Sequence, residues 1–194
     1  MRVVAGELRG RRLSSAPGRE TRPTSERARA GLFDWLGARV AGARVLDLFA
    51  GTGALGIEAL SRGASDAMFV ERSRDALRAL RRNLAELALE ARASVVERDL
   101  SRGLGARVLE RAGFDLVFAD PPYEGGWLAR LLACDSLAQL LSPGAVVIAE
   151  RSLRSAPEPE SSGLRLRGSK SYGETAFDWY ERTAEPAEAG RAEP

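Results

Sequence analysis

Short apolar runs alternate with longer amphipathic segments through the central part of the chain, from residue 44 to residue 149. The runs span four to six residues and are rich in Val, Leu, Phe and Ala, which is typical of buried strands. They predict strands at 45–49, 67–71, 94–97, 114–119 and 145–149. The segments between them predict helices at 54–62, 74–90, 100–112 and 127–141. Strands that alternate with helices indicate an α/β fold with a mostly parallel sheet and helices on both faces.

The start of the chain follows a different pattern. Residues 2–5 and 8–13 predict a β-hairpin in which Gly6-Glu7 is a two-residue turn, and a loop follows at 14–22. Pro23-Thr24-Ser25-Glu26 then predicts a helix start, because Thr24 or Ser25 can cap the first turn and Glu26 lies near the positive end of the helix dipole. Apolar residues recur at helical spacing after it, so this helix should pack on the main domain.

The end of the chain departs from the alternating pattern as well. After residue 150, a polar loop precedes two strands at 164–167 and 176–182, which we expect to pair antiparallel at the sheet edge and to bring it to seven strands. Residues 184–194 contain only Ala, Glu, Pro and Gly apart from one Arg, and we expect them to be disordered. The chain therefore divides into a hairpin and loop at 1–22, a main domain at 23–183 and a tail at 184–194.

Positive charge is concentrated at the start of the chain. The formal net charge of the whole protein is +2, but residues 1–30 hold eight Arg and three Glu, a net of +5. Such a segment indicates a polyanionic partner, and a solvated basic surface is the competing interpretation. The candidates for phosphate contact are Arg9, Arg11, Arg12 and Arg22, and Arg9 and Arg11 share one face of the predicted return strand.

The composition excludes several kinds of chemistry. The chain contains no His, which excludes His-based triads and proton shuttles, and with a single Cys we expect no metal site. That residue, Cys134, cannot form an intramolecular disulfide and fits a reducing cytoplasm. No apolar run approaches the roughly 18 residues of a transmembrane helix, and no signal-peptide pattern opens the chain. We therefore expect a cytoplasmic protein without a membrane partner.

The loop after the first strand, Gly51-Thr52-Gly53-Ala54-Leu55-Gly56, has a glycine spacing that lets the backbone approach a ligand closely. A dinucleotide enzyme could use it for a pyrophosphate, but Asp47 in the preceding strand would repel one. The same carboxylate favours the α-amino group and sulfonium of S-adenosylmethionine. Glu71 ends the second strand, where it could accept from ribose hydroxyls, and Asp99 follows the third, where it could accept from an adenine amino group.

A second polar group, Asp120-Pro121-Pro122-Tyr123, follows the strand predicted at 114–119. Each proline fixes its own φ and removes a backbone donor, so this corner cannot be absorbed into a helix or a strand ladder. A carboxylate, a free carbonyl and an aromatic ring at such a stiff corner suit a planar substrate that carries an NH2 group.

The two motifs resemble those of a known family. Asp47 to Gly53 together with Asp120 to Tyr123 is similar to the S-adenosylmethionine-dependent methyltransferases that modify exocyclic amines of bases. Shorter motifs resemble the bacterial small-subunit (16S) ribosomal RNA guanine-N2 methyltransferases, and these are Arg2 to Gly6, Arg9 to Arg11, Arg22 to Thr24, Gly56 to Ala64 and Tyr172 to Thr175. The resemblance runs from residue 1 to about residue 182 and implies the Rossmann-like fold of class I methyltransferases.

The resemblance also implies a mechanism and a site. A guanine leaves its stack, and its N2 amine donates hydrogen bonds to Asp120 and Pro121 while it attacks the methyl-sulfonium in line. We expect the catalytic residues to be Asp120, Pro121, Pro122 and Tyr123. We expect S-adenosylmethionine to contact Asp47, Phe49, Ala50, Gly51, Thr52, Gly53, Glu71, Arg72, Asp99 and Leu100.

Other functions stay open from the residues alone. An adenine-N6 methyltransferase would use the same corner, although the chain has no sizeable insertion for recognising a DNA target. An NAD-dependent oxidoreductase could use the glycine loop, but Asp47 and the Asp120 to Tyr123 corner argue against it. A non-catalytic RNA-binding protein could keep the fold. The expected partner is small-subunit ribosomal RNA or an assembling small subunit, and we expect the protein to act as a monomer.

Overall fold

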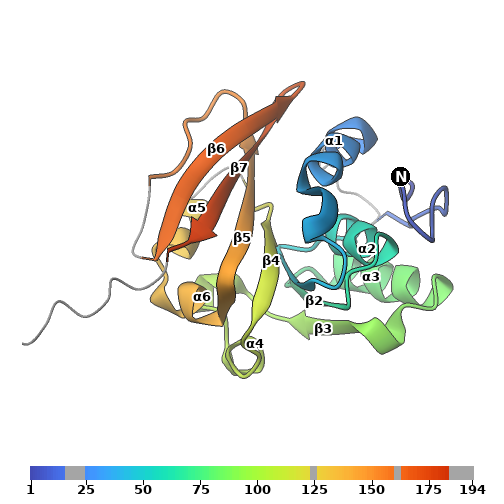
Figure 1. Cartoon of the computed structure of the whole chain (residues 1–194). Helices are drawn as coiled ribbons and strands as arrows, with labels where there is room; N and C mark the ends of the chain where they lie inside the picture. Colours follow the sequence, from blue (N-terminus) through green and yellow to red (C-terminus); the bar gives the residue numbers. More distant parts are fainter. Residues whose placement is uncertain (16–24, 123–125, 160–162, 184–194) are drawn as a thin grey trace, which may run out of the picture.

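A seven-stranded sheet forms the centre of the protein in the computed structural model, which describes residues 1–15, 25–122, 126–159 and 163–183 (Figure 1). The strands are β1 (Arg44–Leu48), β2 (Asp66–Glu71), β3 (Ala93–Glu97), β4 (Phe114–Ala119), β5 (Leu141–Ser152), β6 (Leu164–Tyr172) and β7 (Thr175–Arg182). Their order is β3-β2-β1-β4-β5-β7-β6. Strands β1 to β5 run parallel, whereas β7 runs antiparallel to β5 and β6 antiparallel to β7. The predicted mostly parallel sheet with an antiparallel pair at its edge is confirmed.

Helices cover both faces of this sheet (Figure 1). They are α1 (Glu26–Leu36), α2 (Ala54–Ser61), α3 (Arg74–Glu86), α4 (Ala106–Leu109), α5 (Trp127–Leu132) and α6 (Asp135–Leu140). Successive strand residues point to opposite faces, so Val45 of β1 packs with α1, α2 and α3 while its neighbour Leu46 packs with α4, α5 and α6. Two apolar layers of comparable size result. None of the described helices is long and apolar enough to span a membrane.

Some helices are shorter than the sequence predicts. The helix predicted at 74–90 ends at Glu86, because Ala88 has a positive φ of 54° and a 3-10 turn, η2 (Glu90–Arg92), follows. The single helix predicted at 100–112 is wrong. Gly103 and Gly105, with φ of 77° and 81°, divide it into the 3-10 turn η3 (Leu100–Arg102) and the one-turn helix α4.

The predicted helix at 127–141 is also wrong as a single element. It breaks at Ala133-Cys134 into α5 and α6, and its last residue, Leu141, begins β5. Strand β6 extends to Tyr172, well beyond the predicted 164–167, because backbone pairing with β7 continues through a polar stretch. Gly173, with a φ of 64°, lies in the turn that joins the two strands.

The first residues double back on themselves, but not through the predicted two-residue turn. Arg2 and Arg12 form an antiparallel bridge, and Leu13 N–H donates to the Met1 carbonyl at 3.0 Å. Between these ends the chain makes turns rather than strands. The Gly6-Glu7 hairpin turn is wrong because the neighbouring N–H groups of Val4 and Ala5 donate to the Glu58 carboxylate at 2.7 and 3.0 Å instead of to a partner strand.

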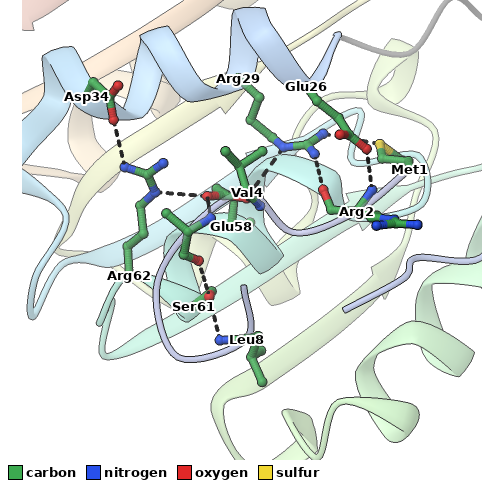
Figure 2. A network of polar contacts seen from close by, with 12 residues as sticks. Met1, Arg2, Val4, Leu8, Glu26, Arg29, Asp34, Glu58, Ser61 and Arg62 are labelled. Carbon is green, nitrogen blue, oxygen red and sulfur yellow. Dashed lines mark hydrogen bonds and ion pairs between the residues drawn. The ribbon is translucent and has the colours of Figure 1, made fainter. Parts of the chain in front are cut away.

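A buried network of charged and polar groups fastens this N-terminal segment, residues 1–15, to α1 and α2 (Figure 2). Arg29 and Glu58 have fully buried side chains, and Arg29 donates to the Arg2 carbonyl. Arg62 donates to Glu58 at 2.9 Å, and Ser61 Oγ accepts from Leu8 N–H at 3.0 Å. Glu58 therefore binds two cations and two backbone N–H groups, which compensates much of the cost of burying its charge.

Helix α1 begins as predicted. Ser25 is its N-cap, and its side chain accepts from Ala28 N–H at 3.1 Å. The loop residues before it, including Arg22 and Thr24, lie outside the described residues, as does the tail predicted at 184–194.

Candidate active site

Acidic side chains meet at the carboxyl ends of three neighbouring strands. Asp47 lies near the end of β1, Glu71 ends β2, and Asp120 directly follows β4. Strand β1 pairs with β2 on one side and β4 on the other, and the strand order reverses between β1 and β4. Open α/β sheets bind ligands at such a switch point, outside the carboxyl ends of the strands. The fold thus brings together both acidic motifs singled out in the sequence.

Asp47 is buried and fixed to the glycine loop. Its side chain is 2% exposed, and Oδ2 accepts the Gly56 N–H at 2.9 Å. Burial raises the pKa of Asp47 to about 7; the Gly56 hydrogen bond opposes this rise and the nearby Glu71 charge adds to it. A carboxyl group in this environment is stabilised as an anion when a cation binds beside it.

Glu71 holds the same loop from the other side. Its Oε2 accepts the Gly51 N–H at 2.8 Å, and its Oε1 accepts the N–H groups of Arg72 and Ser73 at 2.8 and 2.7 Å. A carboxylate has about four acceptor sites, so three backbone bonds leave room for a further donor. The predicted contact with ribose hydroxyls stays a prediction that this geometry permits.

Glycine is required in the loop by close packing. A Cβ on Gly56 would overlap the Phe69 ring, and one on Gly53, whose φ is 86°, would overlap Leu80 of α3. Ala50 and Thr52 complete the loop, and the Ala50 N–H donates to the Val70 carbonyl of β2 at 3.0 Å. The backbone of the loop therefore lies directly on β2 and α3.

Asp99 and Arg72 form a more exposed pair at the rim of the site. Asp99 caps η3 by accepting the Ser101 N–H at 3.0 Å, and it lies 3.4 Å from the Arg72 guanidinium. The bonds from Ser101, followed by the charge of Arg72, hold the pKa of Asp99 below its usual range. Its proposed role toward adenine stays a prediction.

Glu150 is an acidic residue that the sequence reasoning missed. Ala119 of β4 pairs with Ala149 of β5, so Asp120 and Glu150 follow paired residues on neighbouring strands. Burial raises the pKa of Asp120 well above its usual range, and the charges of Glu150 and Asp47 raise it further. The sequence did contain a signal for it. Glu150 directly follows the strand predicted at 145–149, just as Asp120 directly follows the strand predicted at 114–119.

An open pocket of about 190 Å³ is lined in part by residues that lie close in the sequence to Asp47 and Asp99. Phe49, which follows β1, and Leu100, which follows Asp99, form part of its wall. Their contact with the cofactor stays a prediction. Trp127 lies in the same wall, with its ring centroid 6.3 Å from that of Phe49. Phe49 adopts a positive φ of 60°, which turns the chain from β1 into the glycine loop. The pocket is mostly apolar and suits a flat ring.

The corner after β4 is described in part. Pro121 is buried and Pro122 is exposed, whereas Tyr123 lies outside the described residues.

Arg9, Arg11 and Arg12 are all exposed on the N-terminal segment, and Arg11 donates to the Glu86 carbonyl of α3 at 2.8 Å. Arg9 lies in a turn, so the predicted shared strand face of Arg9 and Arg11 is wrong. Among the residues that the structure describes, no three His, Cys, Asp or Glu side chains are grouped so as to hold a metal ion.

Comparisons with known proteins agree with this fold. Residues 1–181 match the family described as conserved hypothetical protein 95. A Bacillus subtilis protein provisionally named as an rRNA methyltransferase is 38% identical over 183 residues, 94% of this chain and 99% of that protein. Ribosomal RNA small subunit methyltransferase D of Escherichia coli strain K12 is 32% identical over 185 residues, 95% of this chain and 91% of that protein. A solved Escherichia coli structure, provisionally described as a methyltransferase, has a TM-score of 0.80 at 31% identity and covers 95% of this chain and 99% of its own.

Proposed function

The chain belongs to the family described as conserved hypothetical protein 95, with ribosomal RNA small subunit methyltransferase D among its relatives, and we propose that it methylates small-subunit ribosomal RNA. The methyl donor in this proposal is S-adenosylmethionine, and the acceptor is the exocyclic N2 amine of a guanine. A solved Salinibacter ruber RNA methyltransferase, in complex with S-adenosyl-L-homocysteine, shares the fold with a TM-score of 0.62 at 19% identity.

The observation that supports this cofactor most strongly is the position of Asp47. Its carboxyl group is buried, its pKa is raised to about 7, and it lies against the glycine loop at the switch point of the sheet. A cation beside it would be stabilised, whereas a pyrophosphate would be repelled. S-adenosylmethionine carries both an α-ammonium and a sulfonium, and the apolar pocket suits its adenine. This charge pattern argues against a nicotinamide dinucleotide.

The corner after β4 would hold the acceptor amine. The Asp120 carboxylate and the Pro121 carbonyl accept its N–H groups, which disfavours delocalisation of the nitrogen lone pair into the base. S-adenosylmethionine supplies the methyl group, so that the new N–C bond forms as the S–C bond breaks. The attack leaves a positive charge on the methylated nitrogen and a neutral thioether, and Asp120, beside Glu150, can accept the proton that this cation then releases. Positioning and electrostatics provide the rate enhancement without a covalent enzyme intermediate.

The N-terminal segment supports RNA as the substrate. Arg9 and Arg12 are exposed on it, and Arg11 is exposed while it donates to α3. Exposed arginines held on an anchored segment can bind phosphates without losing much conformational freedom. Arg22 belongs to the same basic stretch of the sequence.

The test is methyl transfer from labelled S-adenosylmethionine to naked ribosomal RNA, small subunits and DNA, followed by nucleoside analysis. We expect label in N2-methylguanine from ribosomal RNA or small subunits. Label in N6-methyladenine would overturn the choice of base, because the Asp120 corner accepts either amine. Tight binding of NAD without binding of S-adenosylmethionine would overturn the proposed cofactor and with it the function.

A further inference from the structure

Asn83 of α3 joins two parts of the chain that the proposed function uses separately. Its side chain is 1% exposed. The side-chain Oδ1 accepts the Ser14 N–H at 2.7 Å, and Nδ2 donates to the Ser14 carbonyl at 3.2 Å and to the Thr52 carbonyl at 3.0 Å. Ser14 lies at the end of the N-terminal segment, and Thr52 lies in the glycine loop.

This bridge uses the hydrogen-bonding capacity of an amide in a way that other residues cannot reproduce. Both N–H donors of the amide are used, one toward each partner, and the oxygen accepts from Ser14. Rotating the amide by half a turn would place its NH2 group against the Ser14 N–H, and two donors cannot hydrogen-bond to each other. Because the amide is buried, breaking either link leaves a polar group without a partner, which is costly in free energy.

Neighbouring contacts of α3 support the same connection. Leu80, one helical turn before Asn83, packs on Gly53 so closely that a Cβ there would overlap it. Arg11 of the N-terminal segment donates to the Glu86 carbonyl near the end of the same helix. The single helix α3 therefore contacts both the glycine loop and the N-terminal segment.

We propose that Asn83 is a positioning residue that couples binding of RNA at the N-terminal segment to binding of the cofactor at the glycine loop. The inference rests on the proposed function and adds a regulatory link within its site. RNA that binds with Ser14 in its observed position also holds Asn83 and the Thr52 carbonyl in place. The loop is then ordered before the cofactor binds. Coupling of this kind is reciprocal, so the cofactor must strengthen RNA binding by the same factor.

The experiment measures the dissociation constant of a ribosomal RNA fragment by fluorescence anisotropy, with and without saturating S-adenosylhomocysteine. In the wild-type protein we expect S-adenosylhomocysteine, the product of methyl transfer, to lower the dissociation constant for RNA by at least fivefold. This factor is the lower end of typical couplings. The variant Asn83→Ala should reduce that ratio to about one. Ser14→Pro removes the N–H donated to Oδ1 and also fixes φ at residue 14. It should reduce the ratio in the same direction, and it decides the test if Asn83→Ala does not fold.

The matched control is Ser61→Ala. Ser61 Oγ accepts from Leu8 N–H and donates to the Ala5 carbonyl, so it anchors the N-terminal segment without contacting the glycine loop. This variant should weaken RNA binding equally with and without the product, so its ratio keeps the wild-type value. A wild-type ratio of one, or an unchanged ratio in Asn83→Ala and Ser14→Pro, would overturn the coupling while leaving the proposed function intact. Failure of the wild-type protein to bind RNA or S-adenosylhomocysteine would overturn both.

Discussion

At the scale of single residues, the buried Asp47 carboxyl that we propose for cofactor binding makes the fold less stable as pH rises. Its carboxyl pKa is raised by burial from the ordinary value of 3.8 to about 7, so the folded protein holds this proton more tightly than the unfolded chain. The stabilisation is fully present below the unfolded pKa near 4 and is lost as pH rises through 7. A shift of about three units corresponds to at most ~4 kcal/mol. We predict that Asp47→Asn raises the unfolding temperature at pH 8 and changes it much less at pH 4, as measured by calorimetry.

Cofactor binding should respond to Asp47 in the opposite direction. Because a bound α-ammonium favours the ionised carboxylate, we expect the affinity for S-adenosylhomocysteine to rise as pH increases from 5.5 to 7.5, with proton release on binding. Asp47→Asn should bind at least tenfold more weakly and lose most of this pH dependence. Isothermal titration in buffers of different ionisation enthalpy measures both effects. An equally steep pH profile in the variant would show that another group is responsible.

Asp120 should affect the chemical step rather than cofactor binding. The variant Asp120→Asn keeps the size of the side chain and an acceptor oxygen but removes the charge that polarises the amine. We predict a loss of 100-fold or more in kcat, comparable to the loss of one electrostatic contact in other active sites. The affinity for S-adenosylhomocysteine should stay within a few-fold of wild type. Single-turnover methyl transfer measures the first effect, and a normal rate in the variant would exclude Asp120 from catalysis.

At the scale of secondary structure, local signals decided which elements were predictable. The bounds of β4 were predicted correctly, because Gly113 precedes its apolar run and Asp120-Pro121 follows it. The break between α5 and α6 was not, because leucines recur at helical spacing on both sides of Ala133-Cys134. Only packing of both short helices on β4 and β5 distinguishes them from one long helix.

The site shows the same division between local and long-range information. The strand-end carboxylates were readable from the sequence, because their positions follow from the parallel sheet. The attachment of the N-terminal segment was not, since Val4 and Ala5 bond to Glu58, more than 50 positions away. Nothing near Asn83 in the sequence indicates its contacts with Ser14 and Thr52. Buried polar contacts between distant segments carry no periodic pattern that the sequence could display.

Gly6 tests how firmly the N-terminal segment is seated. Its φ is 82°, and a Cβ there would overlap the carbonyl of Ser61, a backbone atom that cannot easily move. Gly10 has a φ of 81° but open space around its Cβ position, so Gly10→Ala is a control with the same backbone strain. We predict that Gly6→Ala weakens RNA binding at least several-fold more than Gly10→Ala, while both bind S-adenosylhomocysteine normally. Equal effects of the two variants would mean that the contact with α2 does not position the segment.

At the scale of the whole molecule, charge and sheet are arranged asymmetrically. The N-terminal segment lies on the face covered by α1, α2 and α3, and α4 lies on the opposite face (Figure 1). RNA that reaches Asp120 across the carboxyl edge of the sheet would therefore meet the exposed Arg9 and Arg12 from one side only. The chain as a whole carries a net charge of only +2, so the proposed function requires a local basic surface rather than the overall field for phosphate contacts.

This asymmetry predicts a salt dependence that differs between the two faces. Each phosphate contact contributes about −0.7 to the slope of log K against log salt for single-stranded nucleic acid. The double variant Arg9→Gln and Arg12→Gln should therefore lower the magnitude of the slope by about one to two, with weaker RNA binding at low salt. Arg107→Gln, which removes an exposed charge from α4 on the opposite face, should leave the slope unchanged. Because both changes remove exposed arginines, they separate a localised RNA contact from a general loss of positive charge. Equal slopes in all three proteins would place the RNA contacts away from the N-terminal segment.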